Sequence, residues 1–119
     1  MAATGSRLNV NESDGVTVVS FNDRNILEEA NIQAIGDEVA AIIEKKPLPK
    51  LLIDFQNVEH LSSAALGTLI TINNRIKQKG GQLRLANIDP QIYEVFIITK
   101  LNKLFQIHDT REQALASFK

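Results

Sequence analysis

The sequence predicts an α/β fold with a mostly parallel sheet, an antiparallel hairpin at its start and helices packed on the sheet. The main observation is that short apolar stretches alternate with longer stretches in which apolar residues recur every three or four positions. Strands that alternate with helices in this way form parallel sheets with right-handed crossovers. A second observation is the Asp14–Gly15 pair between two alternating stretches, which is a strong hairpin signal. The expected order is β-β-α-β-α-β-α-β-α.

The first part of the chain contains the hairpin and a long helix. Apolar residues alternate on both sides of the turn, namely Leu8 and Val10 before it and Val16, Val18 and Phe21 after it. A helix is expected from about residue 27 to residue 45 because one of its faces is apolar, with Ile32, Ile35, Val39, Ile42 and Ile43. Pro47 and Pro49 prevent this helix from continuing.

The middle of the chain supplies a buried strand and a second helix. Leu51, Leu52 and Ile53 form a continuous apolar run that ends at Asp54, which is typical of a strand covered on both faces. The second helix is expected from about Ser63 to Lys79, where a glycine pair ends it.

The last part of the chain repeats the alternation. A strand around Leu83 and Leu85 comes before a helix that Asp89-Pro90 opens, because Asp favours the cap and Pro the first turn. A short strand and a final helix follow, marked by Leu104, Phe105 and Ile107 for the strand and by Asp109 or Thr110 for the helix cap.

Length and composition bound the class of protein. We expect residues 1–119 to form a single domain, with residues 1–6 flexible, because 119 residues suffice for one buried core. The net charge of −1 argues against nucleic-acid binding, which requires clustered positive charge. The sequence has no cysteine, no apolar leader and no run of about 18 apolar residues that would span a membrane. These features predict a cytoplasmic protein without membrane insertion.

The candidate site lies in the loop after the strand that contains Ile53, and its residues are Asn57 to Ser63. In open sheets, functional groups gather at the carboxyl ends of the strands. Ser62 is a natural N-cap, so Ser63 is expected at the first helical position and pointing outward. A phosphoryl group on Ser63 would meet the free N–H groups of a helix start, which favour anions. The alternative is that both serines only cap a helix and that the small residues after them only allow tight packing.

Other chemistries find less support in the sequence. His60 next to the serine pair raises the idea of a small hydrolase, but the nucleophile elbow, an orienting acid and an oxyanion hole are not evident. His60 and His108 have no spacing that suggests a metal site. Gly80–Gly81 follows a helix, so it is no dinucleotide fingerprint, and a weak nucleotide-binding module is a further alternative without support. We expect no enzymatic activity and no cofactor.

The segment from Leu51 to Gly67 resembles STAS domains of the anti-anti-sigma factor (anti-sigma factor antagonist) kind. The family's motif after this strand usually reads Asp-Ser-Ser/Thr-Gly-Leu-Gly, and a partner kinase phosphorylates its first serine. The residues that match or replace this motif here are Ser62 for the Asp, Ser63 for the phosphoacceptor, Ala64 for the second Ser/Thr, Ala65 for the first Gly, and Leu66 and Gly67 for Leu-Gly. The segments 79–85 and 95–105 support the resemblance, which covers nearly the whole chain.

The resemblance implies partner switching rather than catalysis. The unmodified domain would dock on an anti-sigma factor, a GHKL-type serine kinase, and so free the sigma factor. Phosphorylation of Ser63, with Ser62 as the alternative acceptor, would release the domain, and a PP2C-type phosphatase would reset it. The implied docking face comprises Asp23, Arg24, Asn25, Asn57, His60, Ser62, Ser63, Ala64, Ala65 and Gly67. On this face Ala65 places a methyl where the family has glycine.

A second binding role stays open beside the switch. A STAS-like subunit of a transporter, or a scaffold in a larger signalling assembly, would use the same fold without phosphorylation. The replacement of the family's Asp by Ser62 favours this alternative.

Overall fold

The structure, a computed structural model, describes residues 8–13, 15–21, 25–26, 29–45, 49–56 and 58–118. Several sequence-based expectations fall outside these ranges: the flexible residues 1–6 and the docking residues Asp23, Arg24 and Asn57. Asn25 lies in a strand, and only its backbone is described.

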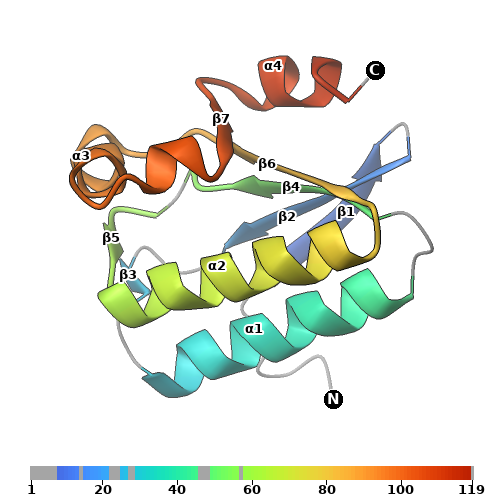
Figure 1. Ribbon diagram of the computed structural model, residues 1–119, viewed down its shortest axis with the longest axis horizontal. Helices are drawn as coiled ribbons and strands as arrows, with labels where there is room; N and C mark the ends of the chain where they lie inside the picture. The colour runs from blue at the N-terminus through green and yellow to red at the C-terminus, as the bar shows by residue number, and fades with distance from the viewer. Residues whose placement is uncertain are drawn as a thin grey trace.

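The centre of the molecule is a five-stranded sheet with the order β1-β2-β4-β6-β7 (Figure 1). Its strands are β1 (Leu8–Ser13), β2 (Val16–Phe21), β4 (Lys50–Asp54), β6 (Gln82–Ala86) and β7 (Gln106–His108). β1 is antiparallel to β2, and the remaining neighbours are parallel. Gly15 has a φ of 82° at the hairpin turn, a conformation that glycine adopts readily. The predicted fold class, with its mixed sheet and initial hairpin, is confirmed.

Two short strands form a separate parallel pair that the sequence did not predict. β3 (Asn25–Ile26) pairs with β5 (His60–Leu61), so that Asn25 lies opposite His60 and Ile26 opposite Leu61. A two-residue strand has no alternating pattern that a sequence could display. The pair joins the segment before the first helix to the segment before the second.

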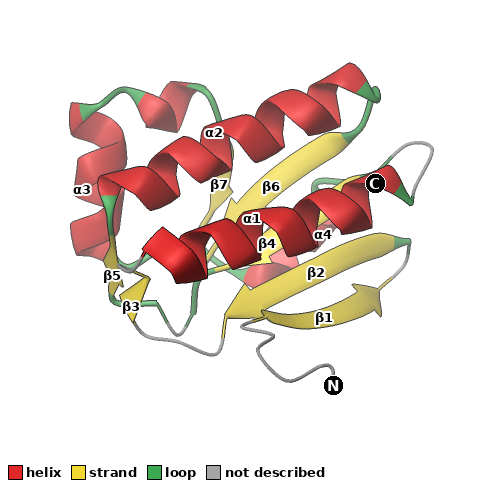
Figure 2. Cartoon of the chain, turned by 90° about the horizontal axis from the view of Figure 1, so that it is seen from below, coloured by secondary structure: helices red, strands yellow, loops and turns green. Residues whose placement is uncertain are grey.

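Helices cover both faces of the sheet. α1 (Glu29–Glu44) and α2 (Ser63–Gln78) lie side by side on one face, and α4 (Arg111–Ala116) lies on the other (Figures 1 and 2). α3 (Pro90–Ile98) stands at the end of the sheet where β4 and β6 finish. Thr110 caps α4, and Asp89 caps α3 as expected. Within the described ranges, no helix combines the length and the apolar character needed to cross a bilayer.

The last strand begins later than the sequence predicted. A 3₁₀ turn, η1 (Leu101–Lys103), follows α3, and Lys100 before it has a left-handed φ of 64°. The Leu104 and Phe105 backbone N–H groups both donate to the Leu101 carbonyl, at 2.9 and 3.2 Å. Their amides are therefore used in the turn, and β7 starts only at Gln106.

The sheet separates a large core from a small one. The large core lies under α1 and α2, and Leu51 and Ile53 of β4 point into it. Leu52 of the same strand points into the small core under α4, which confirms that β4 is covered on both faces. Arg84 is buried on the α4 side, where its Nε donates to Ser117 Oγ at 2.9 Å and its guanidinium lies 4.8 Å from the Phe118 ring centroid. Burial lowers the pKa of the Arg84 guanidinium.

Asp54, the last residue of β4, is a buried carboxylate with only 1% of its surface exposed. Its Oδ1 accepts from the Gln56 backbone N–H and from Asn87 Nδ2, each at 2.9 Å. Its Oδ2 accepts from Arg111 Nε at 2.8 Å and from Arg111 Nη2 at 2.7 Å. A charge in this position requires such partners, because an unpaired buried carboxylate costs several kcal/mol. The carboxylate ties the end of β4 to the loop after β6 and to the start of α4.

Replacing Arg111 tests this connection. Arg111→Met leaves the buried carboxylate without its cation, so we expect a loss of about 3 kcal/mol in the free energy of unfolding. Arg75→Met is a matched control, because Arg75 is exposed and pairs with Glu44 only at 4.0 Å, and it should cost less than about 1 kcal/mol. Urea unfolding followed by circular dichroism measures both. Equal losses in the two variants would contradict a special role for the Asp54 contact.

Candidate functional site

Ser62 caps α2, as the sequence predicted. Its backbone is extended, with φ −80° and ψ 165°, and its Oγ accepts from the Ala65 backbone N–H at 3.2 Å. The Leu66 N–H donates to the Ser62 carbonyl at 3.2 Å, which is the first hydrogen bond of the helix. The hydroxyl of Ser62 is therefore engaged in holding the helix start.

Ser63 is the first helical residue and is exposed. Ala64 and Gly67 are exposed as well, and a Cβ added at Gly67 would meet no atom within 4 Å. No acidic residue lies in the first turn of α2, so no carboxylate of that turn competes for the helix start. The outward side of the first two turns therefore offers one free hydroxyl among small residues, at the positive end of the helix dipole.

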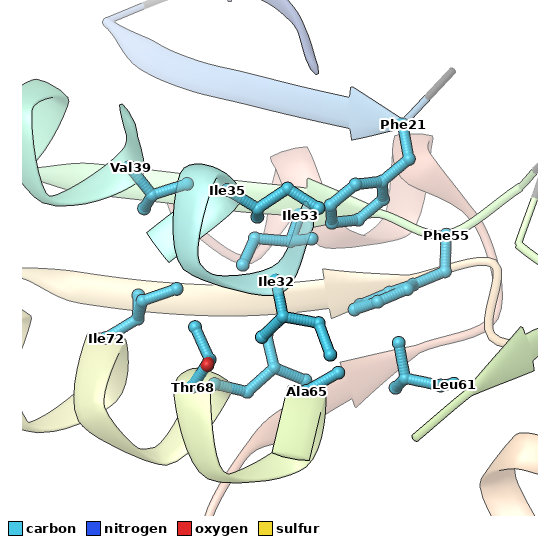
Figure 3. Close-up of a pocket in the computed structure, with 11 residues that line it drawn as sticks. Phe21, Ile32, Ile35, Val39, Ile53, Phe55, Leu61, Ala65, Thr68 and Ile72 are labelled. Atoms are coloured by element: carbon cyan, nitrogen blue, oxygen red, sulfur yellow. The ribbon is translucent and has the colours of Figure 1, made fainter. Parts of the chain in front are cut away.

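Ala65 lies on the opposite side of the helix, contrary to the expectation that its methyl faces a partner. It is only 5% exposed and lines a small apolar cavity of about 20 Å³ under α1 and α2. Figure 3 shows its methyl among Ile32, Thr68 and Leu61. The reason is the helical period, which places Ala65 on one stripe with the buried Leu69, Ile72 and Ile76. That spacing, present in the sequence, could have revealed its inward position.

The pairing of β3 with β5 brings together two parts of the expected docking face. Asn25 lies opposite His60 through the backbone, and His60 is exposed immediately before Leu61 and Ser62. In the described part of the chain, no hydrogen bond joins His60 to either serine, so no serine–histidine nucleophile pair is formed. The described residues also contain no group of three His, Asp or Glu side chains that could hold a metal ion.

Two features near the site were not anticipated. A hollow of about 330 Å³ lies between β5 and α3, lined by Glu59, His60, Leu61, Gln91, Ile92 and Val95. No residue of α3 was expected at the site. The sequence of this helix is almost continuously apolar, which indicates that some of its apolar side chains remain available for contact outside the core. The second feature is a groove of about 460 Å³ between α1 and α2, where Gly36 approaches Thr68 and where Ala64 is part of the wall.

Asn73 is a polar residue of α2 that is buried, with 4% exposure. Its Nδ2 has no hydrogen-bond partner among the described residues. Asn73 belongs to the wall near β6 and η1, and it is not brought to the serine pair.

Comparisons with known proteins agree with this arrangement. A family model described as the STAS domain matches residues 7–114. A Bordetella bronchiseptica protein named "Putative anti-sigma factor antagonist BtrV" is 26% identical over 113 residues, which are 95% of each chain. The structure of an anti-sigma-factor antagonist (STAS) domain protein from Planctomyces limnophilus has a TM-score of 0.82 at 25% identity, covering 92% of this chain and 96% of that one. An anti-sigma factor antagonist from Mycobacterium paratuberculosis has a TM-score of 0.76 at 27% identity, covering 98% and 97%.

The chain belongs to the STAS domain family. The three proteins compared above carry the names of anti-sigma factor antagonists. The resemblance that the segment from Leu51 to Gly67 indicated is therefore confirmed at the level of the family.

The two serines can be separated by their effect on stability. Ser62→Ala removes the cap and should lower the free energy of unfolding by about 1 kcal/mol. Ser63→Ala removes a hydroxyl that caps nothing, so the change should stay within about 0.5 kcal/mol. Urea unfolding of both variants measures the difference, and a Ser63→Ala loss as large as that of Ser62→Ala would refute the assignment of roles.

Proposed function

We propose that this chain is an anti-sigma factor antagonist that works by partner switching, with Ser63 as the phosphorylated residue. The observation that carries the proposal is the exposed hydroxyl of Ser63 at the first position of α2, next to a cap that does not use it. In its unmodified form the chain binds an anti-sigma factor and frees a sigma factor. Its phosphorylated form releases the anti-sigma factor.

The position of Ser63 suits a phosphoryl group physically. The group brings about 1.5 to 2 negative charges at neutral pH. Helix starts favour negative charge, and the first turn of α2 contains no acidic side chain that would repel it. The modification therefore leaves the helix intact and changes the charge that a docked protein meets.

The partners follow from this mechanism. The anti-sigma factor is a GHKL-type serine kinase that supplies the phosphoryl group from ATP, and a PP2C-type phosphatase removes it. The proposed docking face comprises the exposed first turns of α2 and the β3–β5 pair with Asn25 and His60, together with Asp23, Arg24 and Asn57, which lie outside the described residues. The system operates in the cytoplasm, without contact to nucleic acid or insertion into a membrane.

A second function deserves a test because Ser62 stands where the family usually has Asp. In this alternative the chain is a STAS scaffold, or a regulatory subunit of a transporter or of a larger signalling assembly, and Ser63 is never modified. The exposed serine then serves only as part of a constant docking surface.

Phosphorylation in vitro distinguishes the two functions. The chain is incubated with ATP and the GHKL-type serine kinase encoded nearest to its gene, and mass spectrometry locates any phosphate. We expect phosphate on Ser63, none on Ser63→Ala, and binding of Ser63→Asp to the kinase weakened about tenfold or more, because a docked surface meets new negative charge.

Thr71→Ala is the matched control. Thr71 is an exposed hydroxyl residue two turns further along α2, and its Oγ1 donates to the Gly67 carbonyl at 3.2 Å. This variant should be phosphorylated like the unchanged chain. Phosphate on Ser62 would move the acceptor by one residue and keep the mechanism. An unmodified chain together with normal binding of Ser63→Asp would exclude the switch in favour of the scaffold.

A further inference from the structure

α3 is apolar on nearly every side. Ile92 and Phe96 point into the core, as expected of a helix packed on a sheet. Four other large apolar side chains of the helix are exposed, namely Tyr93, Val95, Ile97 and Ile98. Ile98 is 79% exposed, and among the side chains that the structure describes the one further exposed large apolar residue is Val10 of β1. Such a concentration on one short helix marks an interaction surface. Val95 and Ile98 lie three residues apart on one flank of the helix and are termed the α3 patch, whereas Tyr93 lines a separate hollow with Ile107 and His108.

The α3 patch begins next to the serine pair. Figures 1 and 2 both place α3, β5 and the first turn of α2 at the same end of the molecule. The hollow between β5 and α3 joins them, because Leu61 and Val95 both line it and Leu61 directly precedes Ser62. A protein that covers the start of α2 therefore reaches the α3 patch across this hollow.

The exposed start of α2 is too small to be a complete interface. Ser63, Ala64 and Gly67 are its exposed residues among the first five positions of the helix. A specific protein interface uses about 20–30 residues on each side. A partner centred on Ser63 must therefore extend over a neighbouring surface.

Besides the β3–β5 pair, two surfaces of the described residues adjoin the start of α2, and they differ in character. The groove between α1 and α2 is lined mainly by polar or small side chains, among them Gln33, Asp37, Thr68, Thr71 and Arg75. Covering it mostly exchanges hydrogen bonds with water for hydrogen bonds with protein, which yields little net free energy. The α3 patch instead offers apolar area whose removal from water favours association.

We infer that the α3 patch is the apolar anchor of the docking face that contains Ser63. The occupant is the anti-sigma kinase, so the inference rests on the proposed function. The α3 patch and Ser63 contribute differently to binding. The patch contributes apolar contact area that phosphorylation does not alter, and Ser63 contributes the contact that the phosphoryl charge weakens.

The test compares matched substitutions in the full chain. Val95→Asn together with Ile98→Gln removes apolar area without adding charge, and Val10→Asn makes the same change at an equally exposed valine on β1. The exposed fractions are 40% for Val95 and 45% for Val10. Binding to the GHKL-type serine kinase encoded nearest to the gene is measured by isothermal titration calorimetry. We expect at least about tenfold weaker binding for the α3 double variant, at low and at high salt alike, and unchanged binding for Val10→Asn.

Ser63→Asp, measured beside these variants, separates the anchor from the switch. Normal binding of the α3 double variant with weak binding of Ser63→Asp overturns the anchor and leaves the switch intact. Weak binding of the α3 double variant with normal binding of Ser63→Asp supports the anchor and shows that negative charge at Ser63 does not weaken docking. Sedimentation velocity of the chain alone tests for self-association. If the chain is a dimer that the α3 substitutions dissociate while kinase binding is unchanged, the patch serves self-association and the inference is overturned. Circular dichroism confirms that each variant is folded.

Discussion

The buried carboxylate of Asp54 fixes the end of the sheet from which the site is built. It lies where β4 ends, and it accepts hydrogen bonds from the turn after β4, from Asn87 after β6 and from Arg111 at the start of α4. Apolar packing holds the sheet and the helices together, but it is not directional and tolerates small displacements. A charged hydrogen-bonding group with four donors around it has a definite direction. The chain leaves this point toward β5 and Ser62, so the segment that leads to the site starts from a fixed end of β4.

Two adjacent serines differ in role because the chain changes conformation between them. Ser62 has extended backbone angles, which place its hydroxyl over the Ala65 N–H, whereas Ser63 is helical and faces outward. A charge can therefore be added at one residue without loss of the cap at the other. The neighbouring α3 patch complements this arrangement, because charged contacts mainly give specificity whereas buried apolar anchors give most of the affinity.

Local rules explain what the sequence predicted correctly, and non-local contacts explain the rest. Ser62 and Asp89 cap their helices because a capping side chain needs only the next three residues. The β3–β5 pair could not be predicted, since it depends on a contact between distant segments without periodicity. Ala65 was misplaced because a motif comparison treats neighbouring positions alike, although the period of the helix turns this one inward. The exposure of Ile98 was not predictable either, because an apolar helix is usually buried and the sequence does not show which of its sides remains uncovered.

The β3–β5 pair has a consequence for how such a domain diverges. It joins the segments before α1 and α2 through peptide groups, which every residue type except proline supplies in full. The exposed side chain of His60 can therefore be exchanged during evolution while Ser62 and Ser63 keep their place, whereas Leu61 also packs against the core. If the proposed switch operates, duplicated copies of such a gene can acquire different exposed residues around the same serine, so that each copy rejects the partners of the others. Parallel signalling routes in one cell could then share this fold without crosstalk.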